Sequence, residues 1–70
     1  MGPEDLKVSL RKRVYEFGEK TAYVIYPEEF AVGLEHNLFH VLSQEDRGDG
    51  TIVTKMTFEG KMFLCFTEKD

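Results

Sequence analysis

This sequence of 70 residues contains a single cysteine, no tryptophan and no long apolar run. With Cys65 alone, no intrachain disulfide can form, which favours a reducing compartment and therefore a cytoplasmic location. A membrane-spanning helix needs about 20 consecutive apolar residues, so we expect no membrane partner. The opening segment, MGPEDLKVSL, is acidic and then mixed, and we read no signal peptide in it.

Motifs that would support catalysis are also missing. There is no glycine-rich phosphate loop, no serine beside a plausible base, and no pair of carboxylates that spacing alone would bring together. A chain of this length leaves little room for both a core and a closed pocket. We therefore predict one domain over residues 1–70, which is not an enzyme and holds no cofactor.

Negative charge dominates after residue 20. Residues 1–20 carry five basic and four acidic side chains, whereas residues 21–70 carry four basic and nine acidic ones, for a net charge of −4. An acidic surface repels nucleic-acid phosphates over a Debye length. The charge distribution thus favours a protein partner over duplex nucleic acid.

Hydrophobic periodicity predicts the first half of the fold. Residues 6–14 alternate between apolar and polar, which is typical of a half-buried strand, and residues 21–26 read as the returning strand. Pro27 and the two glutamates after it predict a helix start. We expect this helix to reach about residue 42, although residues 38–44 fit a strand as well.

Two further strands are expected in the second half, over residues 50–58 and 61–67, joined by a tight turn that contains Gly60. The predicted fold class is α+β. We expect a small antiparallel β-sheet of four or five strands, ordered ββαββ or ββαβββ, with one helix packed on one face.

The predicted strands carry apolar side chains on both sides, whereas a sheet with one wet face alternates cleanly. One helix covers one side only, so the second side needs a partner or must curl upon itself. We predict a small protein-interaction module, of inhibitor or regulator type, that binds another protein or a second copy of itself as a homodimer. Its apolar and aromatic sheet face would have an acidic rim. The expected contact residues are Val24, Tyr26, Val53, Phe63, Glu28, Glu29 and Glu35.

A nucleic-acid-binding small β-domain is the alternative hypothesis. It rests on the only basic cluster, the expected strand 7–13, with tyrosines nearby that could stack on bases. The residues that would bind nucleic acid are Lys7, Arg11, Arg13, Tyr15 and Tyr23.

The segment Glu45–Met56 contains the tripeptide Arg-Gly-Asp, and it resembles the calcium loop of EF-hand proteins through Asp49 and Gly50. Calcium requires six to eight oxygen ligands. Here Arg47 occupies the third position of the loop, and Met56 replaces the carboxylate expected at the twelfth. We predict a solvated turn rather than a calcium or receptor site.

Metal and thiol chemistry have weak support. His36 and His40 are four residues apart, a spacing used by metal pairs on helices, and Cys65 or Glu35 are the candidate third ligands. No further histidine or cysteine completes the set, so we predict no metal site. Cys65 lies among apolar neighbours, which predicts a packing role.

Overall fold

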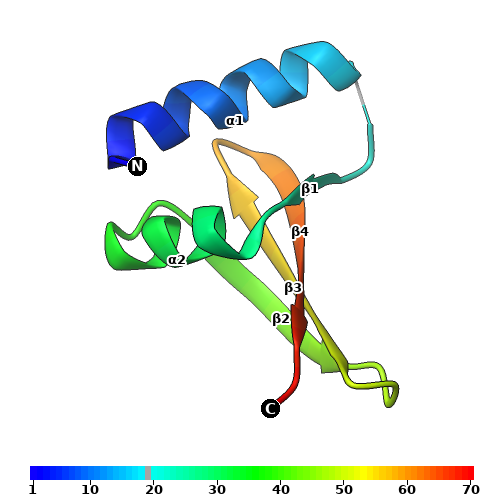
Figure 1. The fold of residues 1–70 in the computed structure, drawn as a ribbon. Coiled ribbons are helices and arrows are strands. Elements are labelled where there is room, and N and C mark those ends of the chain that lie inside the picture. Colours follow the sequence, from blue (N-terminus) through cyan, green and yellow to red (C-terminus); the bar gives the residue numbers. More distant parts are fainter. Residues whose placement is uncertain (19) are drawn as a thin grey trace.

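The computed structural model describes residues 1–18 and 20–70, which form two helices and a four-stranded sheet (Figure 1). The elements are α1 (Pro3–Phe17), β1 (Tyr23–Ile25), α2 (Pro27–Glu35), β2 (His40–Asp46), β3 (Thr51–Phe58) and β4 (Lys61–Glu68). The strand order is β1-β4-β3-β2, with β1 parallel to β4 and the other pairs antiparallel. The predicted α+β class is confirmed: a small, mostly antiparallel sheet has a helix packed against it, and the element order is roughly as expected.

The first element is a helix, so the strand predicted for residues 6–14, which includes the basic strand 7–13, is wrong. Leu6 and Leu10 are fully buried and Val14 packs on the core. Positions four apart share a face both in a helix and in a strand, so these residues fit either pattern.

Two observations distinguish the helix from the predicted strand. Val8, which a strand would bury beside Leu6 and Leu10, is 47% exposed. The segment begins with Pro3 in its first turn and two acidic residues after it, as α2 also does with Pro27. This arrangement suits the positive end of a helix and is a recognisable start signal.

Helix α2 begins where predicted but ends at Glu35, so the expected extension to residue 42 is wrong. Asn37 adopts a positive φ of 54°. The Leu38 N–H donates to Gly33 O at 2.8 Å and the Asn37 N–H donates to Leu34 O at 3.2 Å. These two bonds form a Schellman motif, which ends helices at a left-handed residue such as asparagine.

Gly33 allows the chain to turn back towards the sheet. The ring of Phe39 lies so close that a Cβ at Gly33 would overlap it. Phe39 also packs edge-on against Phe58, with ring centroids 6.2 Å apart. The chain then enters β2 at His40, so the alternative strand considered for residues 38–44 was the closer prediction.

Strands β2, β3 and β4 form an antiparallel meander. The turn between β3 and β4 is confirmed: Glu59 and Gly60 both have positive φ, 50° and 77°, as a tight hairpin with the natural sheet twist requires. Between β2 and β3, the Asp46 carboxylate accepts a bond from the Gly48 N–H. The predicted turn in this segment is therefore also confirmed.

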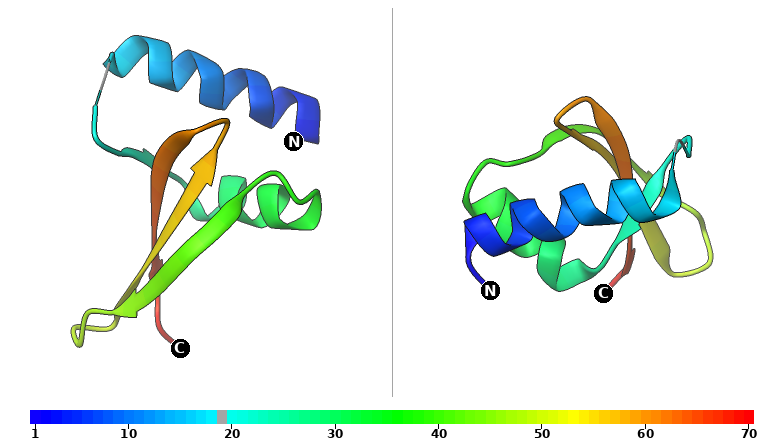
Figure 2. Two further views of the ribbon diagram at one scale, coloured as in Figure 1. Left: turned by 180° about the vertical axis from the view of Figure 1, so that it is seen from behind. Right: turned by 90° about the horizontal axis from the view of Figure 1, so that it is seen from above.

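One face of the sheet holds the core. Its buried residues come from α1 and from β1, β3 and β4: Leu6, Leu10, Tyr23, Ile25, Met56, Phe58, Phe63 and Cys65. Figures 1 and 2 show α2 along this face and α1 across the end of the sheet, above β1 and the β3–β4 turn. No helix of the described residues is long and apolar enough to cross a membrane.

Candidate functional site

The sheet face turned away from α2, called the outer face below, is largely apolar. Strand alternation and the register place matching residues of four strands in rows across it. One row runs from Val24 through Leu64 and Lys55 to Ser43, and the next pairs Phe66 with Val53 and Val53 with Glu45. Met62, opposite Thr57, extends the apolar part along β4.

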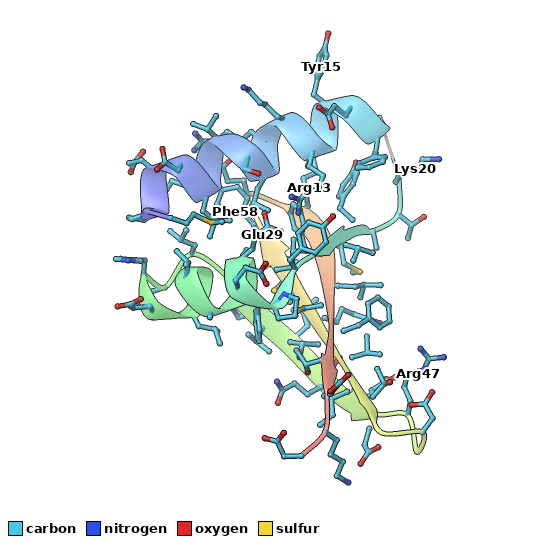
Figure 3. The ribbon with its side chains drawn as sticks, viewed as in Figure 1. Arg13, Tyr15, Lys20, Glu29, Arg47 and Phe58 are labelled. Carbon is cyan, nitrogen blue, oxygen red and sulfur yellow. The ribbon has the colours of Figure 1, made fainter. Side chains whose placement is uncertain are left out.

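Neither α1 nor α2 covers the outer face. Figure 3 shows side chains projecting from β4 on the side away from α2, with neither helix above them. Val24 is 54% exposed and Phe66 is 39% exposed, whereas Val53, Met62 and Leu64 are half-buried. A contiguous apolar patch of this kind marks an interaction surface more often than isolated exposed apolar residues do.

The charges described on the outer face lie on β2, on β3 and at the end of β4. Lys55 is half-buried beside Leu64 in the first row, and Glu45 lies diagonally from it on β2. Glu68 pairs with Thr51 at the far end of β4. Among residues 1–18 and 20–70, no carboxylate lies within ion-pair distance of Lys55.

A groove continues the outer face past the edge strand β1. It has a volume of about 360 Å³, and its lining residues are Arg13, Phe17, Lys20, Ala22, Tyr23, Val24 and Tyr26. Val24 belongs both to this groove and to the outer face. The two surfaces therefore form one continuous region around β1.

A buried ion pair holds this edge in place. Arg13 of α1 donates two hydrogen bonds to the Glu29 carboxylate of α2, at 2.9 and 2.8 Å. The same guanidinium donates to Val24 O at 3.2 Å and lies 5.7 Å from the centroid of the Tyr26 ring. Figure 3 shows Arg13 and Glu29 directed towards each other between the two helices. Arg13 thus joins both helices to the strand that carries Val24.

The ion pair also perturbs the ionisation of its members. Burial acts to raise the pKa of Glu29, but the Arg13 guanidinium and the Tyr26 N–H, which donates to Glu29 at 2.9 Å, outweigh burial and lower that pKa below its ordinary value. The hydrogen bonds to Glu29 raise the pKa of Arg13. Both groups are therefore charged at neutral pH.

The structure brings together some of the apolar residues predicted to contact a partner. Val24 and Val53 lie on the outer face, and Tyr26, 63% exposed, lies in the groove beside it. The expected exposure of Phe63 is wrong, because Phe63 is fully buried on the core face, 5.5 Å from Tyr23 between ring centroids. Met62, Leu64 and Phe66 take its place on the outer face.

The predicted acidic rim is not formed by α2. Glu28 and Glu35 are exposed on the helix that covers the opposite face, and Glu29 is only 3% exposed. The carboxylates that border the outer face are Glu45 and Glu68. The predicted contact residues omit both. Glu45 was left out because the helix was expected to reach about residue 42, which excluded β2 from the predicted sheet.

The residues of the nucleic-acid hypothesis do not form one surface. Tyr23 is 3% exposed and donates its hydroxyl to Gly18 O, whereas Tyr15 is 89% exposed and points away from the sheet (Figure 3). The three cations are all in ion pairs: Lys7 with Glu4, Arg11 with Glu59 and Arg13 with Glu29.

Metal and thiol sites find no geometric support in residues 1–18 and 20–70. These residues contain no cluster of three or more histidine, cysteine or carboxylate side chains placed to hold a metal ion. His36 and His40 are both exposed. Cys65 is fully buried, which confirms its predicted packing role, and burial raises the pKa of its thiol.

Comparison of the chain with protein-family models, with curated proteins and with solved structures finds no match.

Proposed function

We propose that this chain is a small protein-interaction module, of inhibitor or regulator type, that binds a macromolecular partner through the outer face of its sheet. The observation that carries the proposal is the uncovered apolar surface around Val24, Leu64 and Phe66 on the side of the sheet opposite α2. Burying such residues supplies most of the binding free energy at protein interfaces, and aromatic side chains contribute most.

The fixed positions of the side chains on the outer face and the charges at its border also support binding rather than catalysis. Its side chains stand on paired strands, so they are positioned without a partner and lose little conformational freedom on association. Glu45 and Glu68 at the border would steer the partner and select its orientation, because charge at a rim acts mainly on encounter and specificity. The proposal keeps the cytoplasmic location expected from the single free cysteine.

Affinity capture from the source cell with tagged variants tests the proposal. Phe66→Asp introduces a charge into the centre of the outer face, and Tyr15→Asp introduces the same charge at an aromatic residue that is 89% exposed on α1. We expect the wild type and Tyr15→Asp to bind the same partner, and Phe66→Asp to lose it. Equal binding by all three proteins, with circular dichroism showing that each is folded, would contradict the proposal.

A further inference from the structure

We infer that the occupant of the outer face is a second copy of this chain, stacked face to face on the first to form a β-sandwich. The inference rests on the proposed function, because it assigns the partner of that same surface. It is argued from the area of the face, from the self-complementary order of its rows and from the position of Lys55.

The area of the outer face suits a weak dimer. In the order β1-β4-β3-β2 the strands have 3, 8, 8 and 7 residues. With a rise of about 3.4 Å per residue and a spacing of about 4.8 Å between strands, they cover roughly 420 Å². Two copies would therefore bury on the order of 850 Å², which lies in the range below about 1,200 Å² that is typical of weak, transient interfaces. We expect a dimer with a dissociation constant in the micromolar range, on the order of 1–100 μM.

The rows of the outer face complement themselves in one orientation. In this orientation the two-fold axis runs perpendicular to the strands and parallel to the sheet. It passes between two neighbouring rows, the Leu64–Lys55 row and the Phe66–Val53 row. The first row of one copy then lies over the second row of the other copy. Leu64 then packs on the partner's Phe66, twice by symmetry. Aligned sandwiches pack about 10 Å apart, a spacing that such side chains fill.

The same orientation supplies a counter-charge for Lys55. Lys55 lies over the partner's Val53, and the partner's Glu45 is one strand to the side, about 4.8 Å across the sheet. An axis along the strands would instead set Lys55 on the partner's Leu64 and bury its ammonium without a counter-charge, which is unfavourable. Charge complementarity therefore selects the first orientation.

Charge reversal in separate chains tests the contact. Lys55→Glu places like charges across the interface, and so does Glu45→Lys. We expect sedimentation equilibrium to show a dimer for the wild type and at least a tenfold weaker dimer for each variant alone, since opposed like charges are strongly disfavoured. An equimolar mixture of the two variants restores both contacts, so a heterodimer within a few-fold of the wild-type affinity should form.

The matched controls are Arg47→Glu and Asp49→Lys, which make the same charge changes in the exposed β2–β3 loop, outside the strands. They should dimerise like the wild type. Each variant still has like charges at positions 45 and 55 of its own chain when the two are mixed. A recovered dimer affinity in the mixture therefore reports the contact between the two chains. If Lys55→Glu does not fold, Val24→Glu, at a residue already 54% exposed, should give a folded monomer.

Two results would overturn the inference: a wild type that stays monomeric to about 1 mM, well above the expected range, or a mixture that associates no better than either variant. If the wild type is monomeric but capture still depends on Phe66, the partner is a different protein and the proposed function stands. If neither dimerisation nor capture depends on Phe66, the proposed function fails as well.

Discussion

The ion pair between Arg13 and Glu29 should contribute a large share of the stability of this small domain. The change to make is Glu29→Gln, which keeps the size of the side chain and an acceptor for the Tyr26 N–H. It removes the carboxylate charge that meets Arg13 at 2.8 and 2.9 Å. The guanidinium would then stay beneath α1 without a counter-charge.

The magnitude follows from burial. The side chains of Arg13 and Glu29 are 16% and 5% exposed. Removing one member of a buried pair costs about 3–5 kcal/mol. Arg13 keeps some solvent contact and its bond to Val24 O, so we expect a loss of about 2–3 kcal/mol for Glu29→Gln. A domain of this size has a total stability of roughly 4–10 kcal/mol, and Tm should fall by about 10–20 °C.

A double-mutant cycle isolates the interaction. Urea unfolding of the wild type, Arg13→Met, Glu29→Gln and the double variant should give a coupling free energy of about 2 kcal/mol or more. The matched control is the cycle Arg11→Met with Glu59→Gln, which breaks another two-bond pair, at 2.8 and 2.6 Å. That pair is about half exposed on both sides, 52% and 49%, so solvent screens it and its coupling should be much smaller.

Equal coupling in the two cycles would refute the reasoning, because burial would then not set the strength of the Arg13–Glu29 pair. A coupling below about 0.5 kcal/mol for the buried pair would refute it as well. The outcome also bears on function. Since Arg13 holds the backbone of Val24, a weakened pair should loosen β1 and lower affinity at the outer face.

Three further predictions concern pH, packing and nucleic acid. Folding lowers the pKa of Glu29, so the ionised carboxylate stabilises the folded domain at neutral pH, and this contribution is lost as the pH falls below about 4.5 towards the lower folded pKa. Between pH 7 and pH 2 the Tm of the wild type should therefore fall more steeply than the Tm of Glu29→Gln. Parallel curves would contradict this expectation. Gly33→Ala should destabilise the domain by about 1–3 kcal/mol in urea unfolding although alanine favours helices, since its Cβ would overlap Phe39; unchanged or raised stability would show that the ring moves freely. In titrations of labelled single- and double-stranded oligonucleotides we expect no binding at low salt, because Lys7, Arg11 and Arg13 are already paired with carboxylates; tight binding that weakens steeply with salt would support the nucleic-acid alternative.

Part of the outer face was predictable from the strand sequences. Val24 and Val53 were identified because apolar residues occupy both sides of the predicted strands, and both lie on the outer face. The prediction failed at Phe63 because apolar residues fill both phases of β4. Alternation shows that two faces exist, but the register with β1 and β3 decides which residues face the helices.

The sequence by itself determined the features that depend on near neighbours along the chain: the start of α2 at Pro27, the tight turn at Gly60 and the apolar character of both sides of the last two strands. The apolar pattern of residues 6–14 fits a helix and a strand, with Pro3 and the acidic residues after it as the one helix start signal, and the tertiary structure decided for the helix. Only the tertiary structure decided that α2 ends before β2. Buried positions four apart satisfy a helix and a strand equally, and contacts distant in sequence, such as Arg13 with Glu29, select between them. The composition of the outer face has the same origin, because the pairing of distant strands assigns each side chain to the core or to solvent.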